Sequence, residues 1–165
     1  MLIILASAVA ALVLVVIIGI IANSGRQSTP SGAAALGNKL SDLQAILKYS
    51  QSNPLKDSNV VQVVEETNLI LLSRQAELEK VYTLTDPNAK DTPAQPAVIQ
   101  DLDDAKARGS LDSAYIAALR DQLLAVVNQL EIMYKSATTD AKKEVLKRAY
   151  DDFKELANRL PSNSS

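Results

Sequence analysis

The chain has 165 residues, with 17 basic and 19 acidic side chains and a net charge of −2. Nucleic-acid binding calls for a strongly basic face, so we expect no nucleic-acid partner. The chain has neither Cys nor His, which excludes disulfides, thiol catalysis and the commonest general base and metal ligand.

The first predicted element is a membrane span over residues 2–22, LIILASAVAALVLVVIIGIIA, which contains no charged residue. At about 1.5 Å per residue this helix is roughly 30 Å long, the thickness of a bilayer core. A cleaved signal peptide would have a shorter apolar run behind a basic region. We therefore expect one retained transmembrane helix in the plasma membrane, with the lipid bilayer as its partner.

A spacer and a weak orientation signal follow the span. Residues 23–32, NSGRQSTPSG, are typical of a flexible linker. Only Arg26 and then Lys39 follow the span, and no basic residue precedes it. Taken literally, the positive-inside rule favours a cytoplasmic domain by one or two charges. Because no basic residue precedes the span, a native start codon upstream of Met1 is a further alternative.

Apolar residues at alternating steps of three and four predict helices throughout residues 33–160. The first helix ends at Asn53-Pro54, and its stripe comprises Ala33, Leu36, Leu40, Leu43 and Leu47. The second begins near Asp57 or Ser58, either of which can cap a helix, and runs to about Thr83. Its stripe contains Val64, Leu71 and Leu78, which are a heptad apart.

A loop with three prolines, residues 85–96, separates the second helix from a third helical region that begins near Ala97. Gly109 can close one helix there and Ser110 can cap the next. The stripe after this break is Ile116, Leu119, Leu123, Val126, Leu130 and Met133. The stripe of the last helix is Leu146, Ala149, Phe153, Leu156 and Leu160, and residues 161–165 form a disordered tail.

These elements predict an all-α protein: one N-terminal transmembrane helix followed by an antiparallel, up-and-down bundle of about four helices over residues 33–160. Each helix has one apolar stripe and therefore needs neighbours. The alternative architecture is an elongated coiled coil that buries its stripes against a second copy.

The search for chemistry yields no catalytic, cofactor-binding or metal-binding residue. The acidic group Asp101, Asp103 and Asp104 lacks the Gly and Glu of a calcium loop, so we interpret it as the acidic first turn of a helix. We interpret Asp86, Asn88 and Asp91 as turn residues. The basic group Lys142, Lys143, Lys147 and Arg148 is interspersed with acids, which predicts a solvated face of mixed charge.

Polar residues also interrupt the stripe of the second helix: Thr67, Asn68, Arg74 and Gln75. Either they lie at its edge, which is the commoner arrangement, or one forms a buried polar layer. In the last helix, Glu144 with Arg148 and Glu155 with Arg159 are favourably oriented ion pairs four residues apart.

The C-terminal part resembles a group of small, uncharacterised bacterial proteins with one N-terminal span. The pattern covers about 60 residues and rests on Leu102, Ala105, Asp112, Tyr115, Leu119, Gln122-Leu123, Leu130, Tyr134, Leu146, Ala149-Tyr150 and Leu156. The resemblance implies an envelope protein with its domain outside the cytoplasm, and it implies no activity.

We therefore expect a non-enzymatic, membrane-anchored structural or protein-interaction module that binds a protein partner or a second copy of itself. The alternative is an extracytoplasmic sensor that holds a small ligand between bundle helices. We place the domain outside the cytoplasm, because two charges carry little weight in the orientation rule.

Overall fold

The computed structural model describes residues 32–85 and 97–161, and this part of the chain is all-α. Its helices are α2 (Gly32–Ser52), α3 (Ser58–Glu79), α4 (Ala97–Ala107), α5 (Leu111–Ser136) and α6 (Asp140–Arg159). The expected span 2–22, nearly all of the spacer and residues 162–165 lie outside the described residues. None of the helices described here has the length and apolarity needed to cross a bilayer.

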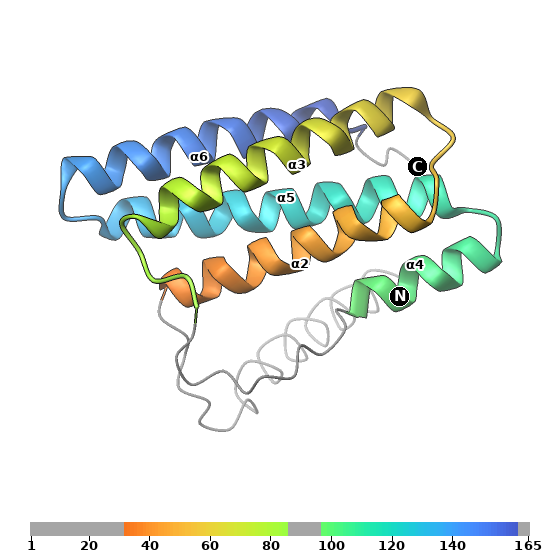
Figure 1. Cartoon of the computed structure of the whole chain (residues 1–165), viewed down its shortest axis with the longest axis horizontal. Helices are drawn as coiled ribbons and strands as arrows, with labels where there is room; N and C mark the ends of the chain where they lie inside the picture. The colour runs from red at the N-terminus through yellow and green to blue at the C-terminus, as the bar shows by residue number, and fades with distance from the viewer. Residues whose placement is uncertain (1–31, 86–96, 162–165) are drawn as a thin grey trace, which may run out of the picture.

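Helices α2, α3, α6 and α5 lie side by side in that order around a shared core, and each runs antiparallel to its two neighbours (Figure 1). Helix α4 packs on the outside of the bundle, against α5 and α2. Helices α3 and α5 are consequently diagonal to one another and run in the same direction. The antiparallel bundle expected from the sequence is present, with α4 as an additional short helix.

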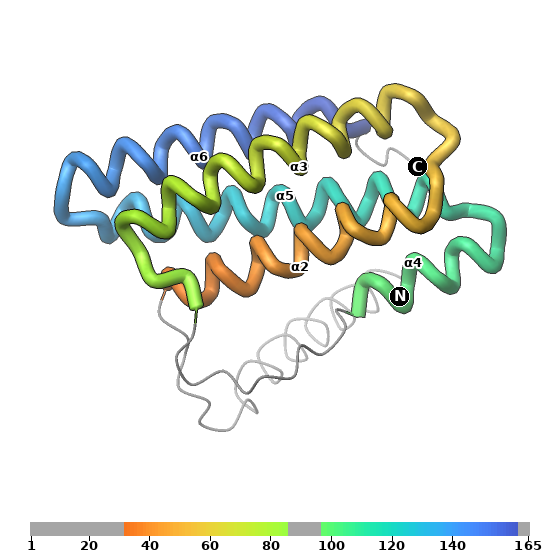
Figure 2. Tube along the Cα trace, in the orientation of Figure 1, coloured from red at the N-terminus to blue at the C-terminus, as the bar shows by residue number. Residues whose placement is uncertain are grey.

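The break at Gly109 is a reversal of the chain, which the tube trace makes plain (Figure 2). Gly109 has a φ of 73°, a left-handed conformation that favours glycine. Its N–H donates to the carbonyl of Lys106, and the Ser110 N–H donates to that of Ala105. Ser110 occupies the N-cap position of α5, as expected, but its side chain donates to the Ala105 carbonyl and makes no capping hydrogen bond.

The expected stripes form the core. Every residue of the predicted stripes of α2, α5 and α6 is buried except Ala33 and Ile116, which are partly buried. Tyr115 and Phe153 are the largest completely buried side chains. Asp57 caps α3 as expected, since its carboxylate accepts the N–H groups of Asn59 and Val60. Helix α3 ends at Glu79, earlier than the predicted Thr83.

A ladder of three hydrogen bonds fixes α5 against α2. The Tyr115 hydroxyl donates to the Ile46 carbonyl at 3.1 Å. The side-chain amides of Gln122 and Gln129 donate to the carbonyls of Lys39, at 2.7 Å, and Gly32, at 3.0 Å. Donors and acceptors both recur every seven residues, which is two helical turns. Sliding one helix along the other would break all three bonds together.

Tyr115 makes the ladder sensitive to alkaline pH. Burial raises the pKa of Tyr115 to about 12, against an opposing contribution from the Ser50 hydroxyl. The folded-state pKa therefore lies above the unfolded value of about 10. The stability that this shift contributes is fully present below pH 10 and is lost as the pH rises from about 10 to 12.

We expect Tyr115→Phe to lower the free energy of unfolding at pH 7 by about 1 kcal/mol, the usual net value of one hydrogen bond. Between pH 10 and 12 the variant should lose stability less steeply than the wild-type protein. Urea unfolding followed by circular dichroism across this range measures both quantities. Identical pH slopes would contradict the assignment. Tyr49, whose pKa is also raised to about 12 by burial and by Asp103, is common to both proteins.

The chain that leaves α3 crosses directly over α2 at Gly37. A Cβ atom at Gly37 would lie 1.9 Å from the Leu84 carbonyl oxygen. Leu84 itself is buried and belongs to the core. The missing side chain of Gly37 thus allows the segment after α3 to pack on α2 and closes this end of the bundle.

Gly37→Ala should destabilise the fold by about 2 kcal/mol, the typical cost of forcing an extra carbon into a packed site. Gly32→Ala is the matched control on the same helix, because its Cβ would meet nothing closer than 3.6 Å. Urea unfolding compares the two variants. Equal stabilities would show that the Leu84 segment moves aside without cost.

Candidate docking surface on helix α3

Ion pairs occupy the side of helix α3 that faces α6. Arg74 Nε lies 2.5 Å from Asp152, and a second nitrogen of Arg74 lies 2.7 Å from Glu77 on its own helix. Two further ion pairs join the helices, Arg148 with Glu77 at 3.8 Å and Arg159 with Glu66. Hydrogen bonds from Arg159 and Gln62 lower the pKa of Glu66, as the Arg74 hydrogen bond does for Glu77.

These contacts correct two expectations about ion pairs and polar residues. Arg159 pairs with Glu66 on the neighbouring helix α3 and forms no salt bridge to Glu155, whereas Arg148 does meet Glu144, at 3.6 Å. Thr67 is completely buried, and its hydroxyl donates to the Val63 carbonyl at 2.6 Å. It is therefore a core residue and not an edge residue.

Large apolar side chains on the outward side of α3 are exposed to solvent. Leu69 is 68% exposed, Leu72 is 53% exposed and Val61 is 37% exposed. Ala76 is also exposed and continues the same face. We call Val61, Leu69, Leu72 and Ala76 the α3 stripe. An exposed row of this kind on one helix is typical of a surface that contacts another macromolecule.

The sequence contains a signal for this stripe. Residues 69–72 read LILL, four consecutive apolar residues. Successive residues point about 100° apart around a helix, so four in a row surround it and cannot all face one core. Leu71 is fully buried and Ile70 is partly buried, which leaves Leu69 and Leu72 outside. The heptad of buried residues predicts the helix but does not reveal the exposed Leu69 and Leu72.

A trough of about 430 Å³ lies beside the stripe, between the loop end of α2 and the first half of α3. Its apolar lining is Leu47, Pro54, Leu55, Val61 and Val64. A second hollow, which shares Gln51 and Asn68 with the first, extends it along α2 to Ser41. Glu65 is the one charged side chain of the first hollow. This polarity suits an apolar side chain of a partner better than a charged metabolite.

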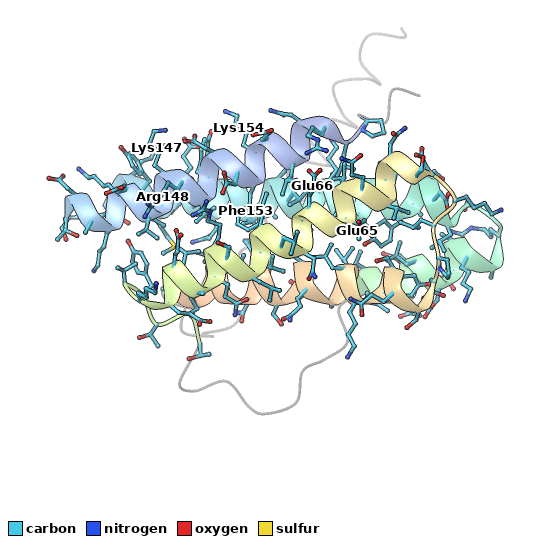
Figure 3. All side chains as sticks on the ribbon, turned by 45° about the horizontal axis from the view of Figure 1, so that its top comes forward. Glu65, Glu66, Lys147, Arg148, Phe153 and Lys154 are labelled. Atoms are coloured by element: carbon cyan, nitrogen blue, oxygen red, sulfur yellow. The ribbon has the colours of Figure 1, made fainter. Side chains whose placement is uncertain are left out.

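Two unpaired charges lie on the outward face of α3, Glu65 between Val61 and Leu69, and Lys80 beyond Ala76. Glu65 forms no ion pair or hydrogen bond within the part of the chain that the structure describes, and it points away from α6, whereas Glu66 faces α6 (Figure 3). The Lys80 ammonium likewise has no bridging partner among the described residues, although its charge contributes to lowering the pKa of Glu77. Leu69, Leu72 and Ala76 thus lie between an unpaired acid and an unpaired base; Glu79, which is exposed beside Lys80, already accepts a hydrogen bond from Gln75.

The acidic residues that the sequence analysis considered as metal ligands do not belong to the α3 stripe. Asp101, Asp103 and Asp104 lie beyond the first turn of α4, which contains no acid, so the first-turn interpretation is wrong. Asp103 instead accepts a hydrogen bond from Tyr49 at 2.8 Å. Residues 32–85 and 97–161 contain no acidic group arranged to hold a metal ion. Asp86, Asn88 and Asp91 lie outside the described residues.

The basic group of α6 belongs to a mixed-charge face, as expected. Lys147 pairs with Asp151 at 2.5 Å, and Lys142 lies 5.2 Å above the ring of Tyr82. Lys147 and Lys154 lie along the outer edge of α6, away from α3 (Figure 3). Lys142, Lys147 and Arg148 have partners of their own, which leaves Lys143 as the one cation of the group without a side-chain partner among the described residues.

Comparisons with protein-family models, curated proteins and solved structures find no match to this chain.

Proposed function

We propose that this protein is a membrane-tethered interaction module without catalytic activity. The span 2–22 holds the bundle at the plasma membrane, and the α3 stripe contacts a protein partner there. The observation that supports this function is the exposure of Leu69 and Leu72 on a helix whose other side is packed into the core. Transferring a leucine side chain from water to an apolar contact contributes roughly 1.5–3 kcal/mol.

The tether would hold the docking surface close to the bilayer. Nine residues separate the predicted span from Gly32, where α2 begins. An extended chain of nine residues reaches at most about 32 Å. The start of α2 would therefore lie within about 32 Å of the end of the span, which keeps the bundle close to the bilayer. We place the bundle outside the cytoplasm, in line with the resemblance to small envelope proteins.

A photoreactive amino acid at position 69 should crosslink to a protein in living cells, because Leu69 protrudes into the proposed contact. Leu72→Asp should remove most of that adduct while changing the free energy of unfolding by less than about 0.5 kcal/mol, since the site is exposed. The same amino acid at Asn128, exposed on α5, is the control. Equal adducts from both positions, or none from position 69, would overturn the docking proposal.

The placement outside the cytoplasm predicts that Ala107→Cys reacts with a membrane-impermeant maleimide in intact cells. Ala107 is exposed at the end of α4, and the wild-type chain has no Cys to compete. Wild-type protein is the blank, and lysed cells give the full labelling level. Labelling that requires lysis would place the bundle in the cytoplasm, the orientation that the basic residues near the span favour.

A further inference from the structure

We infer that the partner of the α3 stripe is a second copy of this chain, docked antiparallel through α3 about a twofold axis between Leu72 and Ser73. The inference rests on the docking surface proposed above and adds the identity of its occupant. It comes from the order of residues along the outward face of α3, where Leu69, Leu72 and Ala76 lie between the unpaired Glu65 and the unpaired Lys80.

The outward face is complementary to itself when reversed. An axis between Leu72 and Ser73 places Glu65 opposite Lys80 of the partner subunit. The same axis places Leu69 opposite Ala76 of the partner subunit, and it brings Leu72 and Ser73 together at the centre. All of these residues are exposed in the single chain. One symmetry operation thus buries Leu69, Leu72 and Ala76 and forms two identical ion pairs, as a twofold interface requires.

Other arrangements of two copies fit these residues less well. In a parallel pair, Glu65 would face Glu65 of the partner subunit, and the two Lys80 side chains would also meet, so like charges would repel at both ends. A face-to-face contact through the α6 side of α3 would have to break the bridges of Glu66 and Glu77. The antiparallel pairing leaves all of those bridges intact.

The second exposed apolar site of the described chain is weaker. Ile132 is 60% exposed and Tyr134 is 41% exposed, both on α5. Tyr134 borders a hollow of about 230 Å³ beside Tyr150. The charged residues around that hollow already form bridges within the chain, Glu131 with Lys135 and Lys147 with Asp151. It offers no unpaired charge of either sign to orient a partner.

Disulfide formation in membranes from cells that express the full chain tests the symmetry. Ser73→Cys lies at the axis and should give a covalent dimer on mild oxidation. Gln62→Cys is the matched control, since it is exposed on the same helix. The two copies of residue 62 would be about 30 Å apart in the antiparallel dimer, far beyond the roughly 6 Å that a disulfide spans between Cα atoms. Dimers from both variants would indicate parallel docking and overturn the inference.

Charge reversal tests the ion pairs independently of folding. In the Ser73→Cys background, Glu65→Lys and Lys80→Glu should each lower the rate of dimer crosslinking about threefold or more, because each replaces two attractions with two repulsions. The double reversal restores opposite charges and should restore the rate. Recovery would be absent if the single variants had merely damaged the helix, and that result would overturn the inference.

The two proposals fail in different ways. If Ser73→Cys gives no dimer but position 69 still crosslinks to a protein of another mass, the docking surface stands and the second copy is excluded. If neither position yields an adduct, both proposals are wrong.

Discussion

The bundle depends on the register between α2 and α5, which three side chains of α5 set by donating to backbone carbonyls of α2. Each carbonyl, those of Ile46, Lys39 and Gly32, lies inside or at the start of a helix. Hydrophobic packing alone is tolerant of small shifts, whereas a hydrogen bond weakens steeply with distance and angle. The ladder therefore selects one register, and α6 and α4 pack against the helix that it positions.

Helix α3 is attached by different means. Bridges to α6 hold one side, and the chain beyond its C-terminal end is packed over Gly37 of α2. No ladder of the kind seen between α5 and α2 joins α3 to α2 among the described residues, and a trough separates the two helices near the loop. This arrangement fixes the direction of the outward face of α3 without covering it, as a docking helix requires.

Much of the fold could be predicted because one-sided burial leaves a periodic trace in sequence. The stripes of α2, α5 and α6 and the Asp57 cap all follow from local spacing. Contacts between residues that are far apart in the sequence leave no such periodic pattern. A Gly-Ser pair allows either a kink or a reversal, and only packing against α5 and α2 decides that α4 turns back. Arg159 likewise has an acid four residues away yet bridges to Glu66 on α3, 93 residues earlier in the sequence.

The exposed leucines of α3 could also be predicted in part, because the spacing of apolar residues along a helix is a local property of the sequence. The LILL run implies that some leucines must lie outside the core, but it does not say which. The packing of α3 against α2 and α6 determines which leucines face outward, and the burial of Thr67 in the core shows how far tertiary packing can override polarity. Gln122 and Gln129 look like edge residues in sequence, because their acceptors are backbone atoms that any residue would provide.

The ladder also determines how the bundle carries mechanical load. Any tension arriving along the chain before Gly32 enters the fold at the start of α2, where the first rung, from Gln129, is attached. The rungs are spaced about 10.5 Å apart along two antiparallel helices. Such a pull drives α2 lengthwise past α5, so the three bonds are strained in shear at the same time instead of opening in sequence. Resistance to stretching is thus shared by three bonds spread along α2, from Gly32 to Ile46.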